Sequence, residues 1–372
     1  MKLLIEKNIL QESLNYVSKA LSTKNIIPVL NGIKFELNNE GLSLTATDND
    51  ITIKTLIDKK DIKKIEEEGC TVIYSKSLLE IMRKLSNTDI LIENFEDNKI
   101  SFTTQSGAVY NFSCFLKEDF PNINLETKQN YIKVNSNDLK TMINQTVFAC
   151  SLQESRPLLT GVNIKITGDL LECIATDSYR LSKKIIKLDR PTTENINIIV
   201  PSRNINELIK VIDSDDEIEI HTFSNKIIFK QENIIFQSSL LNGTYPNTDN
   251  SIPRDFKYKI KLNLKEFYNI IDRASSISQS KDKNIVDFEI IKNKLIIKAA
   301  SLESKMEESM NVENETENDI KISFSAKFML EALKILETEE IYILLNGEIS
   351  PIILKETGNE NLIELILPMK TF

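Results

Sequence analysis

Three stretches of the chain share one pattern of apolar and polar positions, a short alternating strand followed by a helix with a single apolar stripe. The strands are expected at residues 2–6, 131–135 and 258–262. In the first stretch Leu10, Leu14 and Val17 follow the strand at helical spacing. The copies lie about 128 residues apart, which is typical of repeated domains rather than of solenoid units. The pattern therefore predicts three domains of one kind.

Each domain repeats this order of elements once more within itself. Helices are expected at residues 8–22, 75–86, 136–150, 202–212, 263–278 and 325–337. In four of them a serine stands where a helix N-cap is wanted: Ser75, Ser136, Ser202 and Ser325. The other segments alternate as strands, with turns expected at 38–41, 97–98 and 167–169. We predict an α+β chain of three tandem domains, 1–128, 129–255 and 256–372, each made of two β-α-β-β-β units.

The composition describes a globular protein with ample core. Of the 372 residues, 41% are hydrophobic and 27% charged, and the net charge is −9. No apolar run is long enough to span a membrane and residues 1–6 lack a signal-peptide pattern, so a cytoplasmic protein is expected. The single histidine, His221, is expected at a solvated strand position. Four scattered cysteines indicate reduced, mostly buried thiols rather than metal ligands or disulfides: Cys70, Cys114, Cys150 and Cys173.

The distribution of charge favours a partner for the helices rather than for the whole surface. The six expected helices carry slightly more lysine and arginine than aspartate and glutamate, although the chain as a whole is acidic. Twelve such helices from two chains, set side by side on a circle, would leave an opening of about 28 Å, which admits a nucleic-acid duplex. A positive helix layer attracts phosphates without reading sequence. Alternatively, these lysines only keep amphipathic helices soluble.

The stretch 173–182 has the composition of a docking site. Its apolar start runs into Thr176 and Asp177, the usual end of a strand in a tight turn. Tyr179, Arg180 and Leu181 then combine a flat ring, a fixed cation and an apolar side chain, as peptide-binding hot spots do. Part of this stretch recurs at residues 45–48, in the first domain.

Several short motifs in this order make the chain recognisable. They are the segments 42–48, 119–122, 175–181, 199–201 and 367–370, together with Gly161. With the three-domain period, they resemble the bacterial sliding clamp, the beta subunit of DNA polymerase III, over the full length. The resemblance implies clamp domains whose helices line a ring and whose sheets lie outside. It also implies a homodimer that slides on duplex DNA without sequence preference, has no enzymatic activity and needs no cofactor.

The resemblance also implies partners and site residues. The expected partners are the replicative DNA polymerase alpha subunit, the clamp loader and other clamp-motif proteins, in the cytoplasm at the nucleoid and not at a membrane. Their peptides would bind between domains 2 and 3, in a pocket formed by Leu159, Thr176, Ser178, Tyr179, Arg180, Leu181, Pro246, Phe328, Ile349, Leu367, Pro368 and Met369. The expected DNA contacts are Lys24, Lys76, Gln153, Arg156 and Arg203. The dimer interface would include Tyr110, Phe112, Ser276 and Ile277, with the strand 110–115 pairing near residues 274–277 of the partner copy.

The chain departs from the pattern of this family at a few of these positions. Ser178 and Tyr179 stand where glycine and histidine are common, and both are compatible with the turn. Other departures lie at the expected pocket rim, in a loop expected to contact DNA and at the C-terminus: Asn250, Ser251, Pro157, Leu158, Thr371 and Phe372.

Two other functions are open alternatives. A metal-dependent nuclease could use Asp48 and Asp177, but two-metal chemistry needs several carboxylates at one site. These aspartates fall in equivalent places of separate domains, where each is expected to cap its own turn. The second alternative is a repeat scaffold that binds peptides but no DNA.

Overall fold

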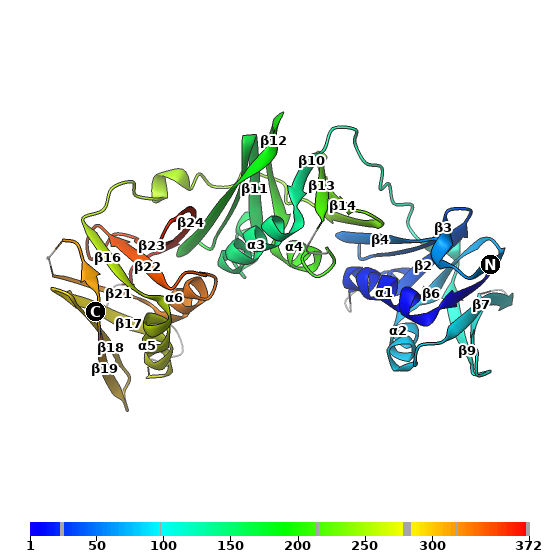
Figure 1. The fold of residues 1–372 in the computed structure, drawn as a ribbon, viewed down its shortest axis with the longest axis horizontal. Helices are drawn as coiled ribbons and strands as arrows, with labels where there is room; N and C mark the ends of the chain where they lie inside the picture. Colours follow the sequence, from blue (N-terminus) through cyan, green and yellow to red (C-terminus); the bar gives the residue numbers. More distant parts are fainter. Residues whose placement is uncertain (23–25, 97, 213–215, 278–283, 317–318, 370–372) are drawn as a thin grey trace. The chain divides into compact units, whose positions relative to one another are not determined.

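The computed structural model describes residues 1–372 apart from 23–25, 97, 213–215, 278–283, 317–318 and 370–372 (Figure 1). Contacts group the chain into two compact units, one of residues 1–137 and 203–240 and one of residues 138–202 and 241–372. The helices within this described part are α1 (Lys7–Val17), α2 (Ser75–Lys84), α3 (Ser136–Thr146), α4 (Ser202–Leu208), α5 (Leu264–Ile277) and α6 (Ala326–Leu333). Each lies within or next to its predicted range, and the ends of the longer predictions are short 3-10 turns, as at 18–20 and 147–149.

One continuous antiparallel sheet organises the first unit. Its strands are β1 (Lys2–Glu6), β2 (Gly32–Asn38), β3 (Gly41–Thr47), β4 (Ile51–Asp58), β5 (Lys64–Glu67), β6 (Gly69–Tyr74), β7 (Asp89–Glu96), β8 (Lys99–Thr104), β9 (Val109–Phe115), β10 (Ile132–Asn135), β13 (Glu217–Thr222), β14 (Lys226–Gln231) and β15 (Ile234–Ser239). Their order is β10-β13-β14-β15-β4-β3-β2-β6-β9-β8-β7-β1-β5. Strand β15 pairs with β4 over Ile234↔Thr55 to Ser238↔Ile51, so strands of the second domain extend the sheet of the first.

Two sheets organise the second unit. Its strands are β11 (Gly161–Thr176), β12 (Arg180–Pro201), β16 (Tyr258–Asn263), β17 (Ile285–Ile291), β18 (Lys294–Ala300), β19 (Lys305–Asn311), β20 (Glu313–Asn314), β21 (Ile320–Ser325), β22 (Glu340–Leu345), β23 (Ile352–Glu356) and β24 (Asn359–Ile366). The orders are β11-β12-β24-β23-β22-β16-β20 and β19-β18-β17-β21. Because β12 pairs with β24, the last strand of the chain joins the sheet of the second domain.

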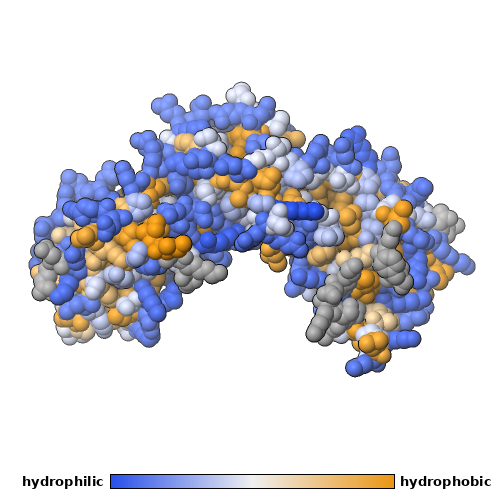
Figure 2. Space-filling model, turned by 180° about the vertical axis from the view of Figure 1, so that it is seen from behind, coloured by the Kyte–Doolittle hydropathy of each residue, from blue (hydrophilic) through white to orange (hydrophobic). Residues whose placement is uncertain are grey.

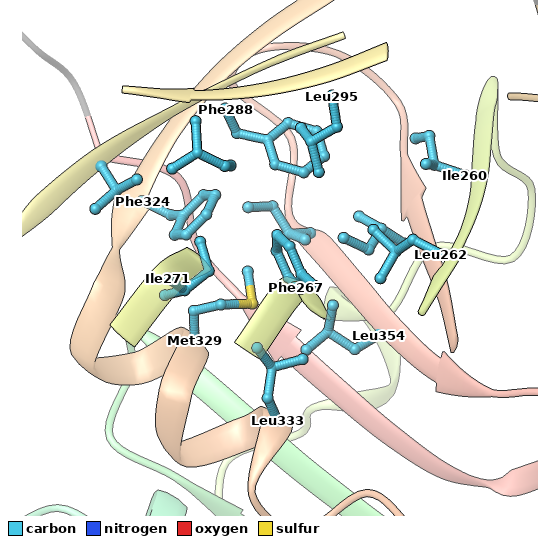
Figure 3. Packing of buried hydrophobic residues seen from close by; sticks show 14 of the residues in the cluster. Ile260, Leu262, Phe267, Ile271, Phe288, Leu295, Phe324, Met329, Leu333 and Leu354 are labelled. Atoms are coloured by element: carbon cyan, nitrogen blue, oxygen red, sulfur yellow. The ribbon is translucent and has the colours of Figure 1, made fainter. Parts of the chain in front are cut away.

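The largest buried cluster described in the second unit lies between its sheets and the helices α5 and α6. Figure 3 shows Phe267 and Ile271 of α5 pointing at Phe288 and Phe324, with Met329 of α6 beside them. These side chains are fully or almost fully buried, and each buried side chain of this size contributes about 1.5–3 kcal/mol. The apolar stripes that predicted the helices are therefore the faces that form this core, whereas Figure 2 shows hydrophilic side chains dispersed over the outside.

Several expectations about turns and caps are corrected. The turn expected at 167–169 is wrong, because β11 runs through it and stays paired with β12 across register shifts at Gly168. Two serines expected as N-caps instead donate to loop carbonyls: Ser75 Oγ to Asn31 O at 2.6 Å and Ser136 Oγ to Asp216 O at 2.5 Å. Ser325 is an N-cap as expected, accepting from the Phe328 N–H at 3.5 Å.

The single histidine is buried, not solvated as the sequence suggested. His221 is 1% exposed and its ring lies 5.3 Å from that of Tyr131. The backbone N–H of Lys128 donates to Nδ1 at 3.2 Å, while Nε2 lies 3.3 Å from a carboxylate oxygen of Glu219. Burial lowers the pKa of His221. The neutral ring thus fixes the backbone at Lys128, where the chain enters the second domain. The alternating sequence pattern around His221 could not predict this contact.

Two of the four cysteines are buried, Cys150 and Cys173, and the other two are half-buried. All four cysteines are free thiols, and burial raises the pKa of Cys150 and of Cys173 to about 12. Thiols held in this state are poor nucleophiles and poor metal ligands. None of the helices in the described ranges combines the length and apolarity needed to cross a membrane.

Candidate functional site: a peptide pocket and its surroundings

The turn at residues 176–180 is built around one aspartate. Asp177 Oδ1 accepts from the backbone N–H groups of Tyr179 at 2.8 Å and Arg180 at 3.0 Å. Ser178 takes a positive φ of 79°, which this capped turn permits and which explains why glycine suits the position. In the first domain Asp48 Oδ1 accepts in the same way from Asp50 and Ile51, and Asn49 has φ 76°.

The second oxygens of these aspartates are also occupied. Asp48 Oδ2 lies 2.5 Å from a guanidinium nitrogen of Arg203, and Asp177 Oδ2 accepts from Arg180 Nε at 3.1 Å. Both carboxylates are thus turn caps, as predicted, and each is also paired with an arginine, which the sequence analysis did not predict. No group of three or more His, Cys, Asp or Glu side chains placed to hold a metal occurs among the described residues. The arrangement gives the nuclease alternative no support.

Arg180 is an internal tie rather than a free surface cation. It is 8% exposed, and besides Asp177 it contacts the carboxylate of Glu331 and donates from a terminal nitrogen to Phe148 O at 2.7 Å. Its guanidinium also lies 4.6 Å from the ring centre of Phe328. Arg180 therefore joins the turn of domain 2 to α6 of domain 3.

The floor of the candidate pocket is apolar. Leu159 and Leu181 are 6% and 3% exposed and belong to one buried cluster with Tyr245 and Leu365. The hydroxyl oxygen of Tyr245 accepts from the Thr176 N–H at 3.1 Å, which fixes the turn over this cluster. Burial raises the pKa of Tyr245 well above its ordinary value, so the phenol stays neutral.

Residues 367–369 run beside the turn at 176–180. Their backbone is held at two points, since Leu367 N–H donates to Tyr179 O at 2.8 Å and Met369 N–H donates to Ser323 O at 2.7 Å. Tyr179 is 59% exposed and Leu367 36% exposed, so apolar side chains stand free beside the buried floor. The backbone of residues 367–369 is therefore held in place beside this turn.

The structure brings most of the expected pocket residues together, but not all of them equally. Leu159 and Leu181 share one buried cluster, Arg180 lies against the ring of Phe328, and Tyr179 is hydrogen-bonded through its backbone to Leu367. Pro246 and Ile349 are exposed, and Pro368 is half-buried. Ser178 is exposed and its Oγ accepts from Arg156 at 2.7 Å, and Met369 is half-buried.

Two residues of the site were missed. Tyr245 could have been found, because the aromatic residue before proline at 245–247 repeats that at 120–122, and Phe120 is likewise buried. Glu331 carries no signal, because its pairing with Arg180 joins positions far apart in the chain.

The expected DNA contacts lie at helix starts and in one loop. Lys76 is exposed at the second residue of α2, and Gln153 and Arg156 are exposed before the 3-10 turn Pro157–Thr160. Arg203 is exposed at the second residue of α4, but its guanidinium forms a salt bridge with Asp48. Lys24 falls outside the described residues.

The strand expected at the dimer interface is partly unpaired. Within the described sheet, β9 pairs with β8 along Val109–Ser113 but with β6 only at Cys114 and Phe115. Phe112 points into its own core, 5% exposed with its ring 5.1 Å from that of Phe102. Tyr110 is half-buried.

The expected pairing of strand 110–115 near residues 274–277 of a second copy stays a prediction. These residues are the last turn of α5, where backbone N–H groups already serve the helix, and Ser276 and Ile277 stand at its end. The strand edge nearest to this helix is β19, which α5 reaches through Arg273 Nε and Glu308 at 3.0 Å.

Family models match nearly the whole chain. They describe the N-terminal, central and C-terminal domains of the DNA polymerase III beta subunit and match residues 1–124, 133–247 and 250–370. The chain belongs to the DNA polymerase III beta subunit family of sliding clamps. This confirms the resemblance and the three tandem clamp domains. The expected boundaries near Lys128 and Asp255 stay predictions.

Relatives of this clamp family cover the chain from end to end. The beta sliding clamp of Bacillus subtilis (strain 168) is 36% identical over 379 residues, covering 100% of both chains, and that of Staphylococcus aureus (strain N315) is 32% identical over 378 residues. The solved sliding clamp of Bacillus subtilis matches with a TM-score of 0.95 at 35% identity, over 100% of both chains. A DNA polymerase III beta chain from Streptococcus pneumoniae TIGR4 matches with 0.95 at 30% identity, again over 100% of both.

Proposed function

We propose that two copies of this chain close head to tail into a ring around duplex DNA and tether the replicative polymerase and other clamp-motif proteins. The chain catalyses no reaction in this role. Its partners insert a short peptide with leucine and aromatic side chains into the pocket at 176–181 and 367–369. The clamp relatives support the role, and the observation that carries the pocket is a fixed C-terminal backbone beside an apolar floor.

The pocket has the anatomy of a peptide site. A leucine or aromatic ring placed on Leu159 and Leu181 would lose its contact with water, and burial of such an anchor contributes about 1.5–3 kcal/mol. Because Arg180 is tied to Asp177, Glu331 and Phe148, we assign it to holding the walls apart at a fixed distance. Tyr179 and Met369 are then the rim residues that a peptide would cover.

A binding experiment tests the pocket. The double variant Tyr179→Ala, Met369→Ala should bind a Gln-Leu-x-Leu-Phe-like peptide at least about tenfold more weakly in fluorescence anisotropy, since two rim contacts are lost. Leu170→Ala is the matched control, because Leu170 is 47% exposed on β11 and outside the pocket. Equal affinity of the double variant and the control would remove the pocket assignment.

For ring closure, the free edge of β9 and that of β19 are the two strand edges available near the expected interface residues. We propose that they pair between copies, with Tyr110 and Phe112 on one side and Ser276 and Ile277 beside β19 on the other. Closure of this kind would also protect two edges that otherwise invite aggregation.

A further inference from the structure

Glu364 is a carboxylic acid enclosed in the second unit beneath the candidate pocket. It lies on β24 directly opposite Ser182 of β12, and its side chain is 2% exposed. Ser182 is fully buried and Gln145 of α3 is 4% exposed. Glutamates are almost never buried this far unless a partner compensates their charge. The partners of Glu364 therefore determine its state.

Ser182 Oγ makes two short contacts with oxygen atoms but carries only one hydrogen, so the hydrogen of one contact must come from another group. Ser182 Oγ lies 2.5 Å from the backbone oxygen of Gln145 and 2.6 Å from Oε1 of Glu364. A hydroxyl has a single hydrogen and a carbonyl oxygen has none to give. The serine proton satisfies Gln145, since otherwise two bare oxygens would face each other at 2.5 Å. The hydrogen in the contact with Glu364 must then come from the glutamate.

The surroundings also disfavour an anion at this position. Glu356 on the neighbouring strand β23 adds negative charge, which raises the pKa of Glu364 further. Arg180 of β12 acts on Glu364 with the opposite sign, but it is committed to Asp177, to Glu331 of α6 and to Phe148 O.

The adjacent buried glutamate shows the opposite arrangement. Glu356 is 5% exposed, yet each of its oxygens has a donor: the Glu337 N–H at 2.6 Å and the Asn359 side-chain amide at 2.6 Å. Two donors are what an ionised carboxylate needs. One strand pair thus carries two buried acids, one facing donors and one facing acceptors.

We propose that Glu364 is a neutral carboxylic acid in the folded protein and donates its proton to Ser182, so that this proton joins β24, β12 and α3. Glu364 is then a positioning residue for the C-terminal segment, because β24 runs directly into Leu367 and the pocket rim. Two hydrogen bonds then follow one another: the Glu364 carboxyl group donates to Ser182 Oγ, and the Ser182 hydroxyl donates to the backbone oxygen of Gln145.

The proton makes the junction sensitive to alkali. Burial raises the pKa of Glu364 well above its ordinary value of 4.5, so the folded chain keeps a proton that the unfolded chain releases. The stabilisation is fully present below the unfolded pKa and is lost as the pH rises towards the folded one. In that window, each pH unit lowers the folding equilibrium constant about tenfold relative to a chain with an uncharged residue at 364.

Denaturation of the full chain at several pH values tests the proposal. Glu364→Gln keeps an uncharged donor at this place, so its unfolding free energy should not show the loss that the wild type shows as the pH rises above the ordinary glutamate pKa of 4.5. Glu194→Gln, at an exposed glutamate of strand β12, is the matched control and should keep the wild-type pH dependence. Parallel pH profiles of the wild type and Glu364→Gln would overturn the proposal.

A spectroscopic measurement decides the matter even if Glu364→Gln does not fold. Carbon-13 NMR of glutamate-labelled wild type should show one side-chain carboxyl resonance that stays at the position of a protonated acid at neutral pH. The absence of such a resonance in the folded protein would overturn the proposal.

Discussion

At the scale of single residues, the chain uses charged groups mainly to fix turns and join domains. Asp48 and Asp177 each cap a turn and hold an arginine, and those arginines are Arg203 and Arg180. From composition alone, such residues would be interpreted as surface charges or as catalytic candidates. Burial distinguishes the cases, because the Asp48 side chain is 2% exposed and that of Arg180 is 9% exposed.

Removing Arg180 should therefore damage the fold before it damages recognition. Arg180→Ala leaves Asp177 and Glu331 without their cation and Phe148 O without a donor, so we expect a loss of about 3 kcal/mol in unfolding free energy. Chemical denaturation measures it. Arg190→Ala on the same strand is exposed and should change stability by less than about 0.5 kcal/mol. A loss for Arg180→Ala no larger than that would show that the tie contributes little.

At the scale of elements, the period of the apolar positions located the six α-helices that the structure describes, but it could not predict contacts between residues far apart in the sequence. The apolar stripe that includes Phe267 and Ile271 predicted α5 correctly, because the side chains of this stripe face the core. The pairing of β15 with β4 joins strands of different domains, and no local pattern encodes it. The turn expected at 167–169 failed because Gly168 takes φ 61° in a bulge between two long strands. The turn residues of the candidate pocket could be predicted from the sequence, but the roles of Glu331 and Glu364 became apparent only from the structure.

Strand β9 carries residues with different roles, which two substitutions can separate. Tyr110→Glu places a charge on the free edge, so it should give folded monomers in analytical ultracentrifugation, with an unchanged circular dichroism spectrum. Phe112→Asp instead puts a charge into the core of domain 1, and we expect a loss of about 3–5 kcal/mol in stability. Ile291→Glu, an exposed site at the end of β17, is the control and should stay dimeric. A dimeric Tyr110→Glu variant would place the interface elsewhere.

At the scale of the whole molecule, we expect an acidic chain to stay on DNA through a few local cationic contacts together with encirclement of the duplex by a closed ring. The net charge is −9, and of the expected DNA contacts Arg203 already has its charge shared with Asp48. Lys76, exposed at the start of α2, is the cation with the clearest access to a phosphate among the described residues expected to contact DNA. Retention should therefore depend on a closed ring more than on affinity.

Retention on DNA of different topology tests this directly. The protein, loaded on a nicked circular plasmid, should remain bound during gel filtration and should be lost once a single cut linearises the plasmid. Lys76→Ala should lower the salt dependence of direct DNA binding, because each lost phosphate contact removes about one released counterion, whereas Arg203→Ala should lower it less. The Tyr110→Glu monomer should not be retained on either DNA. Equal retention on circular and linear plasmid would mean that surface affinity, not encirclement, holds the protein on DNA.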